Sequence, residues 1–182
     1  MIFRTRFAPS PTGPLHLGHA YSACLAHDMA IQHAGTFLLR IEDIDQSRAR
    51  PEWEAQIYDD LTWLGLAWPH PVMRQSERQA AYDAALDQLW ARGLLYPCSC
   101  TRADIKNALS APQEGVPMGP DGVLYPGTCR SIAQRSGPRP REQVLRLDIR
   151  AALTVLGDSE FAFTDTGETS TGVQHTVTPQ SL

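Results

Sequence analysis

Two histidines three residues apart stand near the amino terminus, in the stretch "RFAPSPTGPLHLGHA" from Arg6 to Ala20. His16 and His19 follow a run of prolines and glycines that cannot form a regular helix, so we expect them at the start of the next helix. At that place both rings project from one side, beside backbone N–H groups. Imidazole donors at a helix amino terminus stabilise an oxyanion whose charge grows during a reaction. The spacing indicates an anion site; two histidines that cap a helix or lie at the surface would give the same pattern.

Three cysteines form a second group that could do chemistry. Cys98 and Cys100 are separated by one residue and Cys129 follows later, whereas Cys24 stands alone and is predicted to serve packing. Zinc takes four ligands, usually nitrogen or sulfur. No histidine lies between His70 and His175, so the candidate for the fourth ligand is Tyr125. Spacing alone leaves open whether these residues bind zinc or are buried thiols.

Composition limits the class of protein. The 182 residues suffice for one core, or for a domain that carries an insertion. Hydrophobic residues make up 42% and charged residues 20%, and no apolar run is long enough to span a bilayer. The start lacks the apolar segment of a signal peptide, so we expect a cytoplasmic protein with reduced thiols and no membrane partner.

Net charge is a weaker guide to the partners of the protein than composition. The net charge of −4 argues against indiscriminate binding to nucleic acid. The segment from Arg130 to Arg150 nevertheless carries six arginines and two acidic residues. It is either a local basic patch or an ordinary solvated loop and strand.

The elements that must position the histidines form a strand–helix–strand unit. "IFRTRFAPS" alternates apolar and polar residues up to Pro9, Leu17, Tyr21, Cys24 and Leu25 recur at helical spacing, and "TFLLRIED" reads as a buried strand after a helix stop at Gly35. Such a unit predicts a parallel sheet, and the loop after its first strand lies at the carboxyl edge, where ligands bind in α/β folds. The loop has neither the glycine fingerprint of a dinucleotide site nor the lysine of a P-loop.

Two more helices are predicted before residue 95. The first begins at Pro51 and ends at Gly65, and its apolar stripe consists of Trp53, Ile57, Leu61 and Leu64. The second begins with a capping-box pattern at Ser76 and Gln79 and ends at Gly93, and its apolar face consists of Tyr82, Leu86, Leu89 and Trp90.

The amino-acid composition changes after Leu94. The stretch 111–130 is rich in proline and glycine and too long for an ordinary connection, which indicates an inserted module. Thr101 and Asp104 are expected to cap a short helix, and "EQVLRLDIR" and "EFAFTDTG" to form two strands. The final "TGETSTGVQHTVTPQSL" is polar and turn-rich, and we expect neither helix nor strand there.

The opening stretch, together with "LLRIEDID", "LTWLGLAW", "QSERQAAY" and "LYPCSCTRADI", resembles the class I aminoacyl-tRNA synthetases of the glutamyl type. The resemblance implies an α/β fold. Residues 1–95 would be the first half of a Rossmann-like, nucleotide-binding catalytic domain with a parallel sheet. Residues 96–182 would be a zinc-bearing insertion that handles the acceptor end of tRNA.

The resemblance also implies roles for single residues. His16 and His19 would be catalytic and would stabilise the α-phosphate of ATP during adenylate formation. Arg6 would pair with the side-chain carboxylate of L-glutamate and Glu42 with its α-ammonium group, unless the two form a strand-end salt bridge instead. The remaining expected contacts are Phe7 and Ala8 for glutamate, Pro9 and Ser10 for glutamate and ATP, and Gly13 and Gly18 for ATP.

The cysteines indicate which tRNA would accept the glutamyl group. The set Cys98, Cys100, Tyr125 and Cys129 resembles that of a branch of short relatives that transfer glutamate to the queuosine of tRNA(Asp), and it implies a structural Zn²⁺. Mg²⁺ would accompany ATP. Two alternatives stay open: a fragment of a synthetase that charges tRNA(Glu), and a catalytically silent zinc-containing module that binds RNA or protein.

The resemblance stops before the lysine-bearing KMSK-type loop of the family, and the only lysine here is Lys106. We therefore expect a truncated chain that forms glutamyl-adenylate slowly. A half sheet would also leave a strand edge and apolar surface uncovered.

Overall fold

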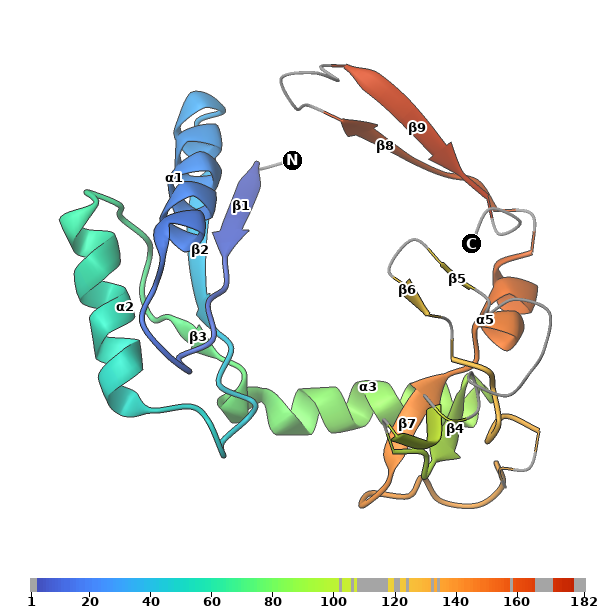
Figure 1. Ribbon diagram of the computed structural model, residues 1–182. Coiled ribbons are helices and arrows are strands. Elements are labelled where there is room, and N and C mark those ends of the chain that lie inside the picture. The colour runs from blue at the N-terminus through green and yellow to red at the C-terminus, as the bar shows by residue number, and fades with distance from the viewer. Residues whose placement is uncertain are drawn as a thin grey trace. The chain divides into compact units, whose positions relative to one another are not determined.

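The chain divides into two compact units, 1–83 and 84–182 (Figure 1). The computed structural model describes residues 3–101, 103–105, 107, 118–119, 122–123, 125–131, 133, 135–157, 159–165 and 172–178. The histidine pair belongs to the first unit, and the three clustered cysteines belong to the second.

A parallel sheet forms the centre of the first unit. Its strands β1 (Arg4–Phe7), β2 (Thr36–Ile41) and β3 (Met73–Arg74) lie in the order β1-β2-β3, and Arg4 pairs with Thr36 in the register. The helices α1 (Leu17–Gln32) and α2 (Pro51–Trp63) connect them. Since strand order follows chain order, right-handed crossovers place both helices on the same face of the sheet (Figure 1). The predicted strand–helix–strand unit with its parallel sheet is confirmed.

The core of the first unit lies between the sheet and its helices. The strands bury alternate residues, which are Phe7, Phe37, Leu39 and Ile41, as the period of two requires. Ile57 and Leu61 of α2 pack on them, as predicted. For α1 the predicted apolar face is wrong: Leu17, Tyr21 and Leu25 are exposed, and the helix buries Ala23 and Ala30 instead. Small side chains let α1 approach the sheet closely, so its large ones remain outside.

The end of α1 corrects a second detail. The left-handed residue is Ala34, with φ of 47°, and the N–H groups of Ala34 and Gly35 donate to Ile31 and Ala30 in the pattern of a Schellman motif. Gly35 is required for another reason, because a Cβ there would lie 2.4 Å from the carbonyl oxygen of Phe3.

The helix α2 has the predicted limits, since it begins at Pro51 and is followed by Gly65 in the left-handed region. The predicted capping box at Ser76 is wrong. Ser76 begins a 3₁₀ turn, η1 (Ser76–Arg78), which leads into α3 (Gln79–Ala91). Its N–H and hydroxyl both donate to the buried Asp43 carboxylate, at 2.9 and 2.5 Å, and Ser76 lies inside the first turn, where Gln75 is the N-cap residue.

A buried carboxylate ties α2 to β3. One oxygen of Glu54 accepts the hydroxyl of Tyr58 at 2.7 Å and two nitrogens of Arg74 at 2.8 and 2.6 Å. Burial first, and then the Glu54 charge and hydrogen bond, raise the pKa of Tyr58 to about 12. The network fixes the short third strand against the helix layer.

The second unit contains short antiparallel pairs. β4 (Leu95–Cys98) pairs with β7 (Val144–Leu147), and β5 (Met118–Gly119) pairs with β6 (Gly122–Val123). Trp90 of α3 is buried and its indole N–H donates to the carbonyl of Gly137 at 2.8 Å. The predicted strand in "EQVLRLDIR" is confirmed only to Leu147, because Asp148 caps a further helix, α5 (Ile149–Leu156), that the sequence did not suggest.

A hairpin closes the described part of the chain. The predicted strand in "EFAFTDTG" is confirmed as β8 (Phe161–Asp165), which pairs with β9 (Val173–Val177). The expectation of no strand near the end is therefore wrong. Five residues with two isolated valines give little alternation, and the strand is completed by cross-strand contacts such as the Phe163–His175 ring stack at 4.9 Å.

The predicted cap after the cysteine pair is present. Thr101 and Asp104 form the expected reciprocal cap, with N–H and hydroxyl of Thr101 both 2.7 Å from the Asp104 carboxylate. Half of the predicted loop 111–130 lies outside the described residues. Among the described residues, no helix has the length and apolar character that a bilayer crossing requires.

Candidate functional site

The loop that carries the histidines is fixed at the carboxyl edge of the sheet. It follows β1, and its Pro9 carbonyl accepts the N–H of Glu42 at 2.9 Å, just beyond the end of β2. The Pro11 carbonyl accepts the N–H of Arg50 at 3.0 Å, just before α2. Pro9 and Pro11 are buried. The loop is therefore held from two sides by backbone hydrogen bonds before it reaches His16.

The two imidazoles cap the amino terminus of α1. His16 is the N-cap residue, and its Nδ1 accepts the N–H of Gly18 at 3.2 Å. Nδ1 of His19 accepts the N–H of His16, also at 3.2 Å. The rings stack with centroids 3.8 Å apart. Helix capping, the alternative interpretation of the spacing, thus describes part of what these histidines do.

Capping also fixes the protonation of the rings. A nitrogen that accepts a hydrogen bond carries no proton, so each neutral imidazole holds its proton on Nε2. Burial first, and then the neighbouring His16, lower the pKa of His19, which favours this neutral form. The pair therefore offers two Nε2–H donors at a helix amino terminus, where an anion is stabilised electrostatically.

Gly18 serves the cap directly. A Cβ at this position would lie 3.1 and 3.2 Å from the Cε1 and Nδ1 atoms of His16. Glycine is needed so that the His16 ring can lie against the first helical turn.

The structure brings six of the predicted site residues together. A hollow of about 280 Å³ is lined by Phe7, Ala8, Pro9, Ser10, Gly13 and His19. The hollow is small and lies between the loop after β1 and His19 in the first turn of α1. His16 lies against a neighbouring hollow of about 320 Å³ beside α2.

Arg6 and Glu42 lie apart from that hollow. Arg6 is exposed and lines a separate cavity of about 340 Å³ on the sheet face opposite the helices. Within the described residues it has no carboxylate partner, so the alternative of an Arg6–Glu42 salt bridge is wrong. Arg40, two residues before Glu42 on the same face, donates to the Glu42 carboxylate instead.

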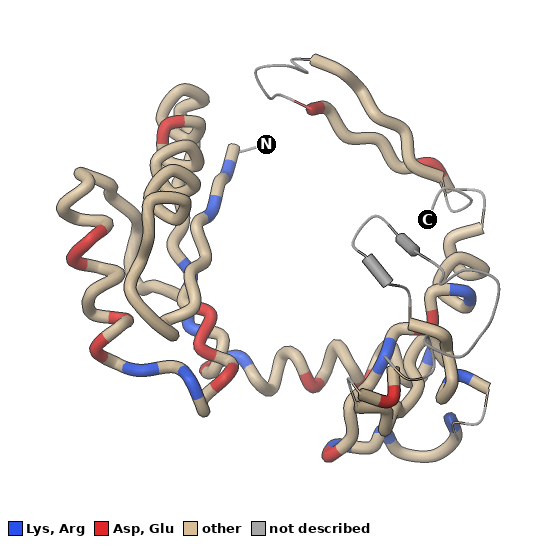
Figure 2. Tube along the Cα trace, viewed as in Figure 1, with Lys and Arg blue, Asp and Glu red and all other residues tan. Residues whose placement is uncertain are grey.

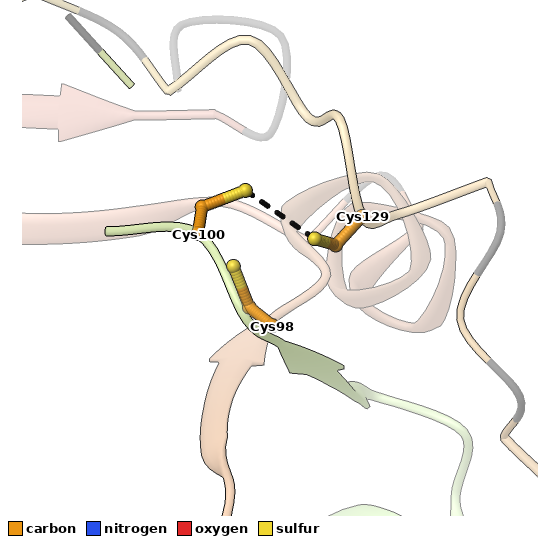
Figure 3. Close-up of side chains that lie close together, drawn as sticks. All are labelled: Cys98, Cys100 and Cys129. Carbon is orange, nitrogen blue, oxygen red and sulfur yellow. Dashed lines mark hydrogen bonds between the residues drawn. The ribbon is translucent and has the colours of Figure 1, made fainter. Parts of the chain in front are cut away.

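The cysteine cluster forms where β4 ends. Cys98 is the last residue of β4, Cys100 follows it, and Cys129 lies in a turn after Gly127, which has φ of 81°. Their sulfur atoms point toward one another (Figure 3) and all lie within 4.8 Å. The Tyr125 hydroxyl is 3.3 Å from Cys98 Sγ and 3.4 Å from Cys100 Sγ. The four predicted metal residues are brought together.

Two of the three thiols favour the anionic form. The N–H of Ser99 and then the Cys100 thiol lower the pKa of Cys129 to about 6. Burial opposes ionisation of Cys98, but hydrogen bonds from Tyr125 and Arg146 outweigh it and lower its pKa. A thiolate is the form that binds metals. The hydrogen bond from Tyr125 acts to lower the pKa of Cys100, but the Cys129 thiol and burial outweigh it and raise that pKa. Burial first, and then the Cys100 and Cys98 thiols, raise the pKa of Tyr125.

The donor set fits a tetrahedral ion. Zinc–sulfur bonds of about 2.3 Å and a zinc–oxygen bond of about 2.0 Å place tetrahedral ligands roughly 3.5–3.8 Å apart. Cys100 and Cys129 are 3.4 Å apart, and the Tyr125 oxygen is 3.3–3.4 Å from two sulfurs. Cys98, Cys100 and Cys129 can hold a metal ion, and Tyr125 stands at the distance of a fourth ligand.

The arginine-rich segment is paired internally. Arg130 and Arg135 contact the buried Asp148, and Arg139 and Arg141 contact Asp87. Figure 2 shows acidic positions among the basic ones in this unit. These four guanidinium groups neutralise carboxylates, so the interpretation as an ordinary structural segment holds for them.

Sequence reasoning missed two residues near the sites. Arg40 was not predicted to hold Glu42, although its i, i+2 spacing on a strand places both on one face. Arg146 was not linked to the cysteines, although it donates to Cys98 at 3.2 Å. That contact depends on the β4–β7 register, for which the sequence offers no signal.

Comparison with known families defines the class of protein. Residues 2–159 match the family "tRNA synthetases class I (E and Q), catalytic domain", and the chain belongs to this family. The Rossmann-like fold with its parallel sheet agrees with that membership.

Particular relatives narrow the similarity. The chain is 54% identical over 178 residues to the glutamyl-Q tRNA(Asp) synthetase of Rhodobacter capsulatus, covering 98% of this chain and 62% of that protein. It is 44% identical to the protein of the same name from Symbiobacterium thermophilum, covering 88% of this chain and 50% of that protein. The chain therefore spans between half and two thirds of these relatives.

Solved structures agree with the fold. Glutamate-tRNA synthetase from Elizabethkingia anophelis superposes with a TM-score of 0.67 at 27% identity, covering 100% of this chain and 38% of that one. A glutamate tRNA ligase from Elizabethkingia meningosepticum, in complex with its amino acid, gives 0.64 at 28% identity, covering 98% and 37%.

Proposed function

We propose that the chain takes part in the ATP-dependent activation of L-glutamate and its transfer to the queuosine of tRNA(Asp). The observation that carries this proposal is the histidine-capped start of α1 at the carboxyl edge of a parallel sheet. It offers two Nε2–H donors, with His19 lining one hollow and His16 lining the neighbouring one. Relatives with 54% and 44% identity bear the name glutamyl-Q tRNA(Asp) synthetase, which supports the choice of acceptor.

In the proposed first step, the α-carboxylate of glutamate attacks the α-phosphate of ATP, and pyrophosphate leaves. His16 and His19 stabilise the charge that grows on the α-phosphate oxygens, so they contribute electrostatic stabilisation rather than a nucleophile. Pro9, Ser10, Gly13 and Gly18 form the backbone against which ATP lies. Positioning of the two reactants supplies the rest of the acceleration.

In the same proposal, Arg6 and Glu42 recognise the two ends of glutamate, and Phe7 and Ala8 form the wall between them. The guanidinium group of Arg6 pairs with the side-chain carboxylate, and Glu42 accepts the α-ammonium group. Glu42 is already bonded by Arg40, so the ammonium group either shares this carboxylate with Arg40 or replaces it. Arg6 is exposed and has no carboxylate partner among the described residues, so it is free to bind an acidic ligand.

The metal in this proposal is structural Zn²⁺, held by Cys98, Cys100, Tyr125 and Cys129. When bound, it supplies cross-links between segments that share little core, and it takes no part in the reaction. Residues 1–95 are assigned to catalysis and 96–182 to the acceptor-end insertion. Mg²⁺ accompanies ATP, and a cytoplasmic location is part of the proposal, since thiols stay reduced there.

The test of activation is glutamate-dependent exchange of pyrophosphate into ATP. His16→Ala and His19→Ala should each reduce the rate by about 10²–10³-fold, the usual effect of removing one charge-stabilising donor. His33→Gln is the matched control, because His33 is exposed at the other end of α1. Exchange that does not depend on glutamate, or that survives loss of both histidines, would contradict the proposal.

The acceptor is tested separately. A charging assay compares queuosine-containing tRNA(Asp), the same tRNA with guanosine at that position, and tRNA(Glu). The similarity to solved glutamate-tRNA synthetases makes charging of tRNA(Glu) the second candidate function. Transfer to the queuosine-containing tRNA alone supports our proposal, whereas transfer to tRNA(Glu) replaces it by the second candidate.

A further inference from the structure

Arg146 differs from the other arginines around it. Arg130, Arg135, Arg139 and Arg141 each contact an aspartate. Arg146 forms no ion pair with a carboxylate in the described part of the chain. Its Nε–H donates to Cys98 Sγ at 3.2 Å, and its guanidinium carbon lies 4.1 Å from the centre of the Tyr125 ring.

The sheet register places Arg146 at this point. In the antiparallel β4–β7 pair, Arg146 is opposite Tyr96 and Val144 is opposite Cys98. Arg146 therefore lies diagonal to Cys98 on the same face of the ladder, within reach of a long side chain. Cys98 and Arg146 are 48 positions apart in the sequence, so their contact is a product of the fold.

The charge of the donor set explains why a cation is needed there. Three thiolates around a divalent ion leave a net negative charge, and a phenolate would add another. Cys98 and Cys129 are buried, with 5% and 7% exposure. A buried charge without compensation is costly. Among the described residues, Arg146 is the cation in contact with two of the four proposed ligands.

We propose that Arg146 is the positioning and charge-compensating residue of the metal site. It orients Cys98 through an N–H···S hydrogen bond and covers the face of Tyr125. Both contacts hold Cys98 and Tyr125 in place and set a positive charge beside the donor set. Partners of this kind, one step removed from the metal, typically change metal affinity by 10–100-fold. The inference rests on the proposed zinc site and deepens it.

The test measures Zn²⁺ affinity of the full 182-residue chain by competition with a chromophoric chelator. Arg146→Gln should weaken binding by about 10–100-fold, and Arg146→Lys, which keeps the charge but loses the planar fork, should fall between it and the parent. The matched control is Arg135→Gln. Arg135 also lies over a tyrosine ring, 5.1 Å from the centre of Tyr96, but it pairs with Asp148 and does not contact the cluster. We expect its affinity within about threefold of the parent.

A second readout separates a role at the metal from a role in folding. With Co²⁺ as the probe, loss of the N–H···S bond should move the sulfur-to-cobalt charge-transfer band to longer wavelength in Arg146→Gln and leave it in place in Arg135→Gln. Parent and Arg146→Gln chains with equal affinity and identical bands would overturn the role of Arg146 and leave the zinc site standing. A parent chain that binds neither ion would overturn both.

Discussion

The histidine pair and the cysteine cluster are held in place by different means. The histidine loop is fixed by backbone hydrogen bonds to the ends of β2 and α2, over a core that includes Ile57 and Leu61. The cysteine cluster lies beside strands of four residues, and the buried core around it consists of Tyr96, Cys98 and Cys129.

The two sites differ in how far their local structure depends on a bound ligand. The first site is a surface feature of a sheet and two helices that pack without it. In the second, the residues proposed to bind the ligand are also most of the local core. Loss of the ligand should therefore leave the local fold intact at the histidines and disturb it at the cysteines.

The largest expected effect is the loss of a cluster cysteine. Cys129→Ser should abolish stoichiometric zinc binding, and proteolytic cleavage between residues 98 and 147 should increase at least tenfold, because the segment loses its cross-link. Cleavage within 1–83 should not change. Zinc content and limited proteolysis with mass spectrometry measure both.

Cys24→Ser is the matched control for that variant. Cys24 is a half-buried thiol that packs against the core of the first unit. Its replacement should leave zinc content and cleavage after residue 98 as in the parent. Equal behaviour of the two variants would remove the distinction drawn between the sites.

A core substitution tests the other side of the comparison. Leu61→Ala removes a fully buried side chain of α2 and should lower the free energy of unfolding of the first unit by about 2–5 kcal/mol. Leu17→Ala, at a position 85% exposed on α1, should cost less than about 0.5 kcal/mol. Denaturant titration measures both. A Leu17 effect as large as that of Leu61 would mean that the outer face of α1 is covered in solution.

Asp43→Asn should have a smaller effect. The Asp43 carboxylate accepts two hydrogen bonds from Ser76, and their loss as charge-assisted bonds should cost about 1–3 kcal/mol. Burial would raise the pKa of Asp43, but the Ser76 bonds outweigh it and lower the pKa. The carboxylate therefore stabilises the fold fully above about pH 4, and this contribution disappears as pH falls through its lowered pKa. The difference in the free energy of unfolding between parent and variant should therefore be larger at pH 7 than at pH 3.

The smallest effect concerns His19. Burial and the neighbouring His16 lower its pKa, so the neutral ring is favoured in the folded chain. Stability from this source is complete above about pH 6.5 and falls as the pH drops below that value. In an NMR titration His19 should titrate below the usual histidine range, and His16→Asn should move its midpoint upward only part of the way, since burial remains. An unchanged midpoint in the variant would contradict the assigned cause.

The features predicted well from sequence are those set by local chemistry. The strand–helix–strand unit follows from alternation and helical spacing, and Pro51 and Gly65 mark the ends of α2. The grouping of Cys98, Cys100, Tyr125 and Cys129 was expected from the few available ligands together with the resemblance to the glutamyl-type synthetases, and the structure brings the four residues together.

The features that were missed depend on tertiary partners. Ser76 was expected to cap its own helix, but it lies inside the first turn, bonded to the Asp43 carboxylate, and Gln75 is the N-cap residue. The large residues of α1 were expected inside, but Ala23 and Ala30 allow a closer approach. Arg146 acquires its role from the β4–β7 pairing of strands distant in the sequence, and β9 is completed by its hairpin partner β8.

Histidine caps have a consequence for how the opening motif can change over evolutionary time. A serine or aspartate cap would satisfy the helix equally well but would present oxygen atoms to a phosphate. Imidazole uses one nitrogen for the helix and keeps the other for a ligand. Selection for a stable α1 and selection for phosphate chemistry therefore act on the same two side chains. A descendant that lost the reaction would still be under pressure to keep "HLGH", so survival of the motif is weaker evidence of activity than a motif without a structural duty would be.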